Sequence, residues 1–404
     1  MKKVAIAGGG PTGVTLALML LQRGISVTLV EAASDFHRVF RGEGLMPSGL
    51  DALNQMGLSK ILEQIPHRPL DGWEFILDKK SLFRVEEPME TDAQPCTLVD
   101  QPPLLEALIL EAQKYNNFEF IQGVAVKDLL WINNRVAGMK LANGREIPAE
   151  VVIGADGRNS IIRQRAGLKL ERQPKSMDVL WFKLAASPRF VDENVFYAIG
   201  DGENAFAVFH GASPGKLHLA WTLSGDNQNE NIDRSNTEWG KVFASLSPSW
   251  LAQHFLDNAE TIEKPIKLSV VVGLCPSWFA PGVILLGDAA HPMSPIRAQG
   301  INVALRDVIA ATNYLVPVLL AEELENKAID EALSQIQKER EPEIIRIQQL
   351  QEEEGRQQKL FPKNKFLLQL FFRLIRLLSK GIRQSWIRRQ RKMRCGVTRV
   401  KLGV

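Results

Sequence analysis

The sequence predicts an α/β fold in which a Rossmann-like domain is interrupted by an antiparallel β-sheet domain and followed by a C-terminal helical extension. Three observations support this prediction. Short apolar runs end in glycine-containing turns near residues 8, 154 and 287, as strands of open parallel sheets do at their ligand-binding ends. The segments between them alternate polar with apolar or aromatic residues, which is typical of antiparallel strands. From Glu322 onward the sequence is charged and helical in spacing.

The composition is that of a folded protein with an ample core. The 404 residues are 45% hydrophobic and 24% charged, and this length predicts two domains or one large domain with an insertion. Cys96, Cys275 and Cys395 are too far apart for a CxxC clip, so a reduced cytoplasmic setting fits best. The histidines show no ligand spacing, and we expect no metal site.

A glycine cluster interrupts the apolar N-terminal stretch, which argues against a signal peptide. No segment offers about 18 uninterrupted apolar residues for a spanning helix.

The N-terminal residues predict a βαβ unit. Its parts are a strand at Val4–Ala7, a helix at Val14–Gln22 stopped by Gly24, and a second strand at Val27–Val30. Residues 8–13 lie between the first strand and the helix and form a GxGxxG motif. This placement predicts a dinucleotide site, against the alternative of a glycine-rich turn that serves only packing.

Each residue of this motif has a physical reason. Gly8 permits the tight turn, Gly10 lets backbone N–H groups approach a pyrophosphate, and Gly13 lets helix and strand pack closely. Glu31 ends the second strand, where a carboxylate can bind ribose hydroxyls. The acid favours FAD or NAD over NADP at this site.

Two further turns distinguish between these cofactors. The strand Val151–Ile153 runs into a turn that contains Gly154, Asp156 and Gly157, and the strand Val283–Leu286 runs into Gly287-Asp288. Together with the first motif, these stretches resemble the class A flavoprotein monooxygenases, the family with the para-hydroxybenzoate hydroxylase fold that includes the ubiquinone-pathway hydroxylases. The resemblance spans about residues 3–308.

The resemblance implies an FAD-binding domain of the GR2 type and an FAD-dependent monooxygenase that uses NAD(P)H and O2. Such an enzyme hydroxylates an aromatic, quinone-precursor or polyketide-like small molecule through a flavin C4a-hydroperoxide. It also implies a set of cofactor-binding residues: Gly8, Gly10, Gly13, Glu31, Arg41, Gln101, Asp156, Gly157, Asp288, Gly300 and Asn302. Of these, Asp156 and Gly157 would also help to place the pyridine nucleotide, and Asp288 would bind the ribityl hydroxyls.

Pro295 and Arg297 are the residues that we expect to act in catalysis, beside the reacting part of the flavin. The family usually has consecutive glycines before the Gln299-Gly300 pair, but here Ile296-Arg297-Ala298 precede it. We expect Arg297 to alter how the flavin ring moves, or to offer a cation to substrate or reductant. A second departure is Gln101, which stands where the family often has an FAD-contacting arginine.

The expected domain boundaries follow these motifs. We assign residues 1–70, 97–175 and 276–330 to the FAD-binding domain, 71–96 and 177–275 to the substrate domain, and 331–404 to the helical extension. Most aromatic residues of the substrate domain should be core, and those lining a pocket would favour an aromatic or apolar substrate. This set comprises Trp181, Phe182, Phe196, Phe206, Phe209 and Trp221. Met46 and His210 are weaker pocket candidates, and His291 is expected to be a helix-start histidine bonded to backbone.

The C-terminal extension is strongly basic. Residues 355–404 contain 15 Lys and Arg and no Asp or Glu. Polar positions recur at helical steps through Phe366–Trp386, so one face is basic and the other apolar; these positions are Gln369, Arg373, Arg376, Lys380 and Arg383. Such a helix can lie on a membrane surface as a peripheral contact, or pack on the acidic body. We expect no nucleic-acid partner, since no recognition fold accompanies the charge.

Two other functions remain open from the sequence. A related flavoprotein, either a halogenase or a prenyl-lipid reductase, would share the cofactor site, although no halogenase-like lysine motif is found. A non-catalytic flavin-binding membrane adaptor would bind the cofactor without substrate-stimulated NAD(P)H oxidation.

Overall fold

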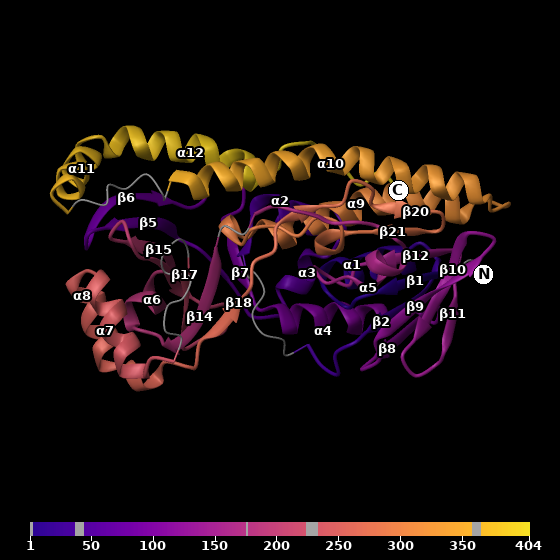
Figure 1. Ribbon diagram of the computed structural model, residues 1–404, viewed down its shortest axis with the longest axis horizontal. Coiled ribbons are helices and arrows are strands. Elements are labelled where there is room, and N and C mark those ends of the chain that lie inside the picture. Colours follow the sequence, from indigo (N-terminus) through magenta and orange to yellow (C-terminus); the bar gives the residue numbers. More distant parts are fainter. Residues whose placement is uncertain (1–2, 37–43, 175–176, 224–232, 358–364) are drawn as a thin grey trace.

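The computed structural model describes residues 3–36, 44–174, 177–223, 233–357 and 365–404. Two large β-sheets lie side by side, and long C-terminal helices extend over both of them (Figure 1). The chain passes between the sheets several times, because the strands of each sheet come from separated segments of the sequence.

The first sheet is the predicted Rossmann-like sheet. Its strand order is β20-β21-β12-β1-β2-β8, parallel throughout except at β20. The strands are β1 (Lys3–Ala7), β2 (Ser26–Glu31), β8 (Phe118–Gln122), β12 (Val151–Gly154), β20 (Phe279–Ala280) and β21 (Val283–Leu285). The residues of β12 and β21 are buried, as expected for strands covered on both faces. The three predicted strand ends therefore meet at one edge of the sheet.

Helices α1 (Pro11–Leu21), α4 (Gln101–Ala112) and α9 (Gln299–Leu320) pack in this domain. The segment Ile296–Leu320 is long and apolar enough to cross a membrane by length and composition, but 72% of its most apolar window is buried inside the protein. Arg306 and Asp307 interrupt its apolar residues and are themselves buried. Within this fold, α9 is a core helix.

The second sheet has seven strands in the order β18-β14-β17-β16-β15-β5-β6. Neighbours are antiparallel, as the alternating sequence predicts, except that β15 and β5 are parallel. This pair joins the two separated segments of the sheet, so no tight turn connects it. The strands are β5 (Gly72–Leu77), β6 (Lys80–Glu86), β14 (Asp178–Ala185), β15 (Val195–Gly200), β16 (Ala205–His210), β17 (Lys216–Leu223) and β18 (Ile266–Leu268).

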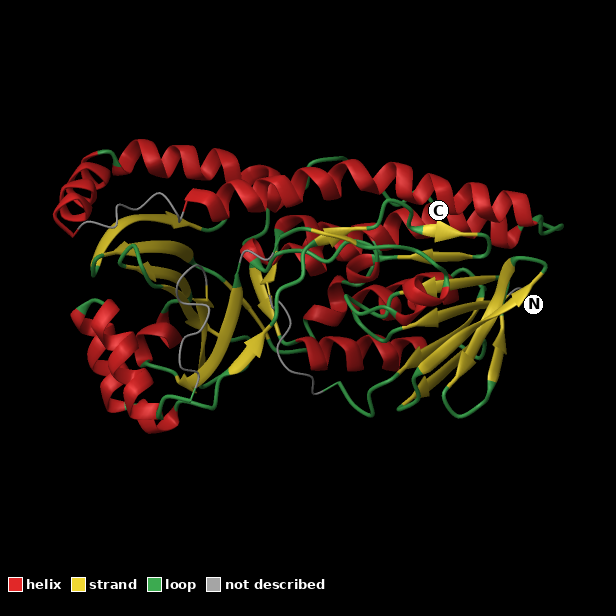
Figure 2. Ribbon diagram, viewed as in Figure 1, coloured by secondary structure: helices red, strands yellow, loops and turns green. Residues whose placement is uncertain are grey.

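The two faces of this sheet have different neighbours. Helices α7 (Asn236–Leu246) and α8 (Ser249–Asp257) cover one face (Figure 2), where Phe182 and Trp221 of the sheet join Trp239 of α7 in one buried cluster. Successive strand residues point to opposite faces. Trp181 therefore belongs to a different cluster from Phe182, one that includes Phe209 and the C-terminal Trp386.

Short elements connect and extend the two large sheets. Helices α2 (Pro47–Gln55) and α3 (Ser59–Leu62) follow β3 (Gly44–Leu45), which forms a small sheet with β4 (His67–Pro69) and β7 (Thr97–Val99). A separate antiparallel sheet consists of β9 (Val126–Ile132), β10 (Arg135–Leu141) and β11 (Glu146–Pro148). The remaining elements are α5 (Ile161–Arg165), α6 (Pro188–Asp192), β13 (Glu171–Arg172), β19 (Gly273–Leu274) and the 3-10 turns η2 (Ala259–Thr261), η3 (Gly287–Ala289) and η4 (Ile296–Ala298).

The C-terminal extension is helical, as predicted, and comprises α10 (Asn326–Gln357), α11 (Lys365–Leu377) and α12 (Ser379–Cys395). The single amphipathic helix expected over Phe366–Trp386 is instead divided at Leu378. Cations of the extension face the protein: Arg383 donates to the backbone oxygen of Arg84, and Arg394 forms ion pairs with Glu87 and Glu90. The side chain of Gln369, part of the predicted basic face, lies outside the described residues.

Candidate active site

A cavity of about 1080 Å³ joins the edge of the Rossmann-like sheet to the second sheet. Residues from both domains line it. The glycine-rich turn contributes Gly10, α4 contributes Gln101, and the third motif contributes Asp288 and Gly300. Gly157 of the second motif also lines it, so residues of all three sequence motifs border one cavity.

The glycine turn before α1 shows two kinds of glycine. A Cβ at Gly13 would stand 2.0 Å from the Gly8 carbonyl oxygen, and a Cβ at Gly8 would stand 2.3 Å from the Ala155 carbonyl oxygen. Gly8 also has a φ of 105°, a conformation that favours glycine. A Cβ at Gly10, by contrast, would meet no atom of the described residues within 4 Å. Gly8 and Gly13 therefore allow close packing, and Gly10 leaves space open at the N-terminus of α1.

The Glu31 carboxylate is buried behind this turn. Its Oε2 accepts a hydrogen bond from the Gly9 N–H at 2.7 Å, and its Oε1 accepts one from the Ala33 N–H at 2.7 Å. Glu31 therefore holds the glycine turn against the end of β2. It does not itself line the cavity, so contact with a ribose stays a prediction.

Asp156 caps the short helix α5. Its carboxylate accepts hydrogen bonds from the Ser160 hydroxyl at 2.6 Å and from the N–H groups of Ile161 and Ile162 at 2.7 and 3.1 Å. Burial raises the pKa of Asp156, and these hydrogen bonds only partly offset the effect. Its neighbour Gly157 lines the cavity, and the predicted contact of this turn with pyridine nucleotide remains a prediction.

The third motif brings three predicted residues to the start of α9. A Cβ at Gly300 would lie 3.8 Å from Asp288 Oδ1, so this carboxylate and the helix N-terminus face the same part of the cavity. Asn302 acts on the backbone instead. Its Oδ1 accepts from the Met46 N–H at 2.8 Å, and its Nδ2 donates to the Gly44 and Ala298 carbonyls at 3.0 and 2.7 Å. Asn302 thus joins α9 to β3 and the start of α2.

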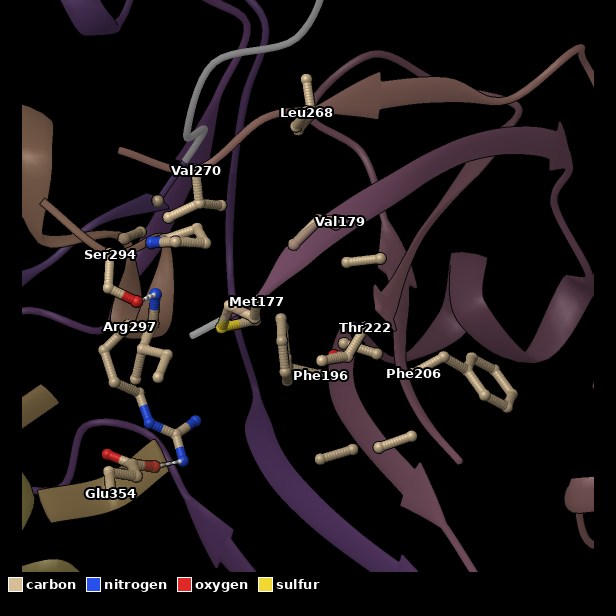
Figure 3. Close-up of a pocket in the computed structure, with 18 of the residues that line it drawn as sticks. Met177, Val179, Phe196, Phe206, Thr222, Leu268, Val270, Ser294, Arg297 and Glu354 are labelled. Carbon is tan, nitrogen blue, oxygen red and sulfur yellow. Dashed lines mark hydrogen bonds and ion pairs between the residues drawn. The ribbon is translucent and has the colours of Figure 1, made fainter. Parts of the chain in front are cut away.

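Pro295 and Arg297 both line the cavity. Figure 3 shows the Arg297 side chain extending from its turn toward Glu354 on α10, with which it forms an ion pair. The cation is thus engaged by the protein. Gln101 lies at the first position of α4, and Arg41, the remaining predicted FAD contact, lies outside the described residues.

The other part of the cavity is lined mainly by apolar and aromatic side chains. Three of the six aromatic residues selected from the sequence line it from the face opposite α7, namely Trp181, Phe196 and Phe209, whereas Phe182 and Trp221 do not line it. Phe206 borders the cavity, but its ring stacks on Trp221 in the cluster under α7. Figure 3 shows Phe196 with Met177, Val179 and Leu268 around this region and the Phe206 ring pointing away from it. Of the weaker candidates, Met46 lines the cavity. His210 does not line it, because its ring is buried and bonded to the Gly211 carbonyl oxygen at 2.7 Å.

The sequence did not single out several lining residues. Trp73 and Phe75 come from β5, and Ile382 and Trp386 come from α12, more than 300 residues later. Trp386 contacts Phe75 edge-on with ring centroids 5.0 Å apart. Only the low polarity of one face of the C-terminal helix signalled this role, and that face alone does not identify what it packs against.

A buried ionic network lies behind the third motif. His291 Nε2 is 2.7 Å from Asp307 Oδ2, which also accepts from the Gly287 N–H at 3.3 Å. Asp307 Oδ1 accepts from Arg340 Nε at 2.9 Å, and Arg340 also pairs with Glu343. His291 is structural, as expected, but it bonds to a carboxylate on α9 rather than to backbone. The network connects η3, α9 and α10.

These features fit a flavin dinucleotide. The space at Gly10 adjoins the N-terminus of α1, where backbone N–H groups favour an anionic pyrophosphate. Asp288 and Gln101 supply hydrogen-bonding groups to the same cavity, which Pro295 and Gly300 also line. Fold and site together define a flavin-dependent oxidoreductase with an apolar substrate pocket.

Comparison with known proteins agrees with this class. Residues 1–350 match the FAD binding domain family. The 6-methylpretetramide 4-monooxygenase of Streptomyces rimosus is 30% identical over 360 residues, which cover 86% of this chain and 82% of the relative. The 3-demethoxyubiquinol 3-hydroxylase of Escherichia coli strain K12 is 25% identical, over 78% of this chain and 79% of the relative.

Solved structures share the fold. The Pseudomonas aeruginosa protein PqsL, in complex with 2-aminobenzoylacetate, has a TM-score of 0.78 and 21% identity over 89% of this chain and 97% of its own. The p-nitrophenol 4-monooxygenase PnpA from Pseudomonas putida DLL-E4 has a TM-score of 0.78 and 18% identity over 99% and 100%. The chain therefore belongs to the FAD binding domain family, and it is an FAD-dependent monooxygenase with NAD(P)H as reductant.

Proposed function

We propose that this monooxygenase hydroxylates an apolar, aromatic substrate of polyketide-like or quinone-precursor type. The aromatic wall of the cavity is the observation that carries this proposal. Phe196 stacks on Phe209 with ring centroids 5.1 Å apart, and Trp73 packs against Phe196 in a tilted arrangement at 4.6 Å. All three line the cavity. Flat aromatic rings bind well against such surfaces. The relatives named for 6-methylpretetramide and 3-demethoxyubiquinol support the same substrate class.

The protein's part in the reaction is to bind, orient and exclude water. The N-terminus of α1 would hold the FAD pyrophosphate, and Asp288 would bind the ribityl hydroxyls. The N-terminal residues Gly300 and Ile301 of α9 line the cavity, and the helix dipole there would stabilise negative charge on the ring edge. FAD bound in this cavity would supply the redox and O2 chemistry of the hydroxylation, with NAD(P)H as the source of electrons. The aromatic wall would place the substrate carbon against the ring and keep the site dry.

The test is a screen of tetracyclic polyketides, quinone-precursor phenols and single-ring acids. We expect substrate-stimulated NAD(P)H oxidation and a product that has gained one oxygen atom, with the multi-ring compounds giving the lowest KM. A product that gains two hydrogens in the absence of O2 would instead identify a reductase. NAD(P)H oxidation that no candidate stimulates would contradict the proposal.

We also propose peripheral membrane contact for a protein that is otherwise cytoplasmic, and α11 is the element that supports it. This helix and Leu378, which follows it, carry large apolar side chains with more than half of their surface exposed: Leu370, Leu374, Leu377 and Leu378. The exposed cations Arg373 and Lys380 lie beside them. An apolar stripe flanked by cations matches the interface of an anionic bilayer.

Vesicle co-sedimentation tests this contact without deleting α12, which packs on the body. We expect the full chain to bind vesicles that contain anionic lipid and to bind neutral vesicles less. The triple variant L374S/L377S/L378S should lose most of this binding. The control is Leu110→Ser, which changes an exposed leucine of α4. Equal binding by the triple variant and the wild type would rule out the contact.

A further inference from the structure

The turn at residues 296–298 has an unusual backbone. Arg297 has φ 60° and Ala298 has φ 49°, so two consecutive residues with side chains occupy the left-handed region. Side chains disfavour this conformation because Cβ comes too close to the following carbonyl oxygen, and the arrangement persists only where neighbouring contacts hold it. The turn leads directly into α9, whose first residues line the cavity.

Helix α10 holds the backbone of this turn from outside. Gln351 Nε2 donates to the Ser294 carbonyl oxygen at 2.9 Å and to the Ile296 carbonyl oxygen at 2.7 Å. Gln351 is itself buried, so these hydrogen bonds are shielded from water. One turn later on the same helix, Glu354 forms the ion pair with Arg297.

The guanidinium of Arg297 also lies among aromatic rings. Its Cζ is 5.3 Å from the ring centroid of Trp73, 5.6 Å from that of Phe75 and 5.0 Å from that of Trp386, all within the range of cation–π attraction. Two of these rings belong to β5, but Trp386 belongs to α12. Figure 3 shows the side chain reaching from the turn to Glu354 across one side of the cavity.

Helix α12 is thus bound to the turn by two routes. Trp386 contacts Arg297 directly, and Gln390 Nε2 donates to Glu354 Oε2 at 3.1 Å. The same helix contributes Ile382, Trp386 and Arg389 to the cavity lining. The helix that closes the substrate part of the cavity and the turn at the flavin part therefore share Arg297 and Glu354.

We propose that Arg297 is a positioning residue that couples α12 to the turn before α9, so that the C-terminal helix is an integral wall of the substrate site. Loss of the cation would release both partners. The turn would lose the ion pair that holds its left-handed backbone, and α12 would lose its attraction to the body near Trp386. This inference goes beyond the proposed function, since it concerns how the site is held and not which substrate enters it.

Hydrogen–deuterium exchange on the full-length protein tests the coupling without any substrate. Arg297→Met keeps the apolar stem and removes the charge. We expect it to increase exchange about tenfold in peptides from α12 and from residues 294–301, while peptides from α7 and α8 remain unchanged. Glu354→Gln should loosen the same two segments by a smaller factor. The matched control is Arg388→Met, which removes an exposed cation from α12 and should change neither segment.

Two outcomes would overturn the proposal. One is that Arg297→Met loosens residues 294–301 and leaves α12 as protected as in the wild type, which would make the arginine a purely local support. The other is that neither segment changes. FAD affinity, measured by flavin fluorescence, gives a second readout. Coupling predicts that Arg297→Met and Trp386→Leu both weaken FAD binding, even though Trp386 belongs to the C-terminal extension and not to the Rossmann-like domain. If Arg297→Met does not fold, Glu354→Gln and Trp386→Leu carry the test.

Discussion

The two ends of the cavity are built in different ways. The flavin end uses backbone: glycine turns, helix N-termini and a few carboxylates placed at the ends of parallel strands. The substrate end uses large side chains from one face of a sheet and from a C-terminal helix. Backbone recognition needs particular residues at fixed spacing, whereas an apolar wall accepts many combinations. Small substitutions at the flavin end should therefore cause loss of folding or of cofactor binding. Substitutions at the substrate end should instead alter substrate preference.

The largest expected effect is at Gly13. The added methyl group of Gly13→Ala would stand 2.0 Å from the Gly8 carbonyl oxygen, and neither backbone segment can move without separating α1 from β1. Overpacking in a core typically costs about 1–3 kcal/mol and occasionally more, and a clash this close with a backbone atom belongs among the cases that exceed that range. We expect little folded protein and no bound FAD, measured by soluble yield and flavin absorbance. A wild-type melting curve for this variant would contradict the close packing.

The second expected effect concerns the buried network behind the flavin end. Burial alone would raise the pKa of Asp307, but the charges of, and hydrogen bonds from, His291 and Arg340 outweigh it and lower the pKa below its usual value. A lowered folded-state pKa gives stability that is present above the unfolded-state pKa of about 3.9 and is lost as the pH falls through the folded-state value. Acid should therefore destabilise the fold through this group below about pH 4.

Asp307→Asn measures that contribution. Removing one partner of a buried ion pair costs about 3–5 kcal/mol, so we expect a large loss of stability at pH 7 in urea unfolding. The difference between variant and wild type should shrink as the pH is lowered from 5 toward 2. A constant difference across this range would show that the Asp307 charge does not contribute as described.

The two faces of the substrate sheet give the third prediction. Phe182 is almost completely buried against α7, so Phe182→Ala should cost about 3–5 kcal/mol and leave substrate preference unchanged. Phe196 lines the cavity and is only partly buried. Phe196→Ala should cost less stability and raise the KM for multi-ring substrates. Thermal unfolding and steady-state kinetics on both variants compare the effects of the two faces on stability and on KM. An equal change of KM in both variants would contradict the assignment of only one face to the substrate.

The same contrast explains how much the sequence could predict. The close packing at Gly8 and Gly13 was predictable because a strand-turn-helix of this kind demands glycine at those positions. The role of Asp288 came from the resemblance to the family and stays a prediction. The alternation of Trp181 and Phe182 predicted two faces of a strand, but not which face would border the cavity. That choice depends on α7 covering one face, which is a tertiary contact.

The contribution of α12 could not be predicted for a related reason. An amphipathic helix with cations and leucines fits either a membrane or a protein surface. In the structure, Trp386 and Arg394 of α12 pack on the body, while Leu374 and Leu377 of α11 remain exposed. The aromatic partners of Trp386 lie about 300 residues earlier, and no local pattern records contacts over such a separation.

The smallest expected effect returns to the flavin end and tests whether its open space belongs to the cofactor. A methyl group at Gly10 would lie more than 4 Å from every atom in the part of the chain that the structure describes, so Gly10→Ala should fold with an unchanged melting temperature in the absence of FAD. The added group would occupy the space at the N-terminus of α1, and we expect FAD affinity to fall about tenfold, roughly 1.4 kcal/mol. Gly381→Ala in α12, also without neighbours within 4 Å, is the control and should leave FAD affinity unchanged. Gly13→Ala should perturb the fold even without FAD, whereas Gly10→Ala should not, so Gly10→Ala reports on cofactor binding alone. Equal FAD affinity in Gly10→Ala and wild type would place the pyrophosphate elsewhere in the cavity.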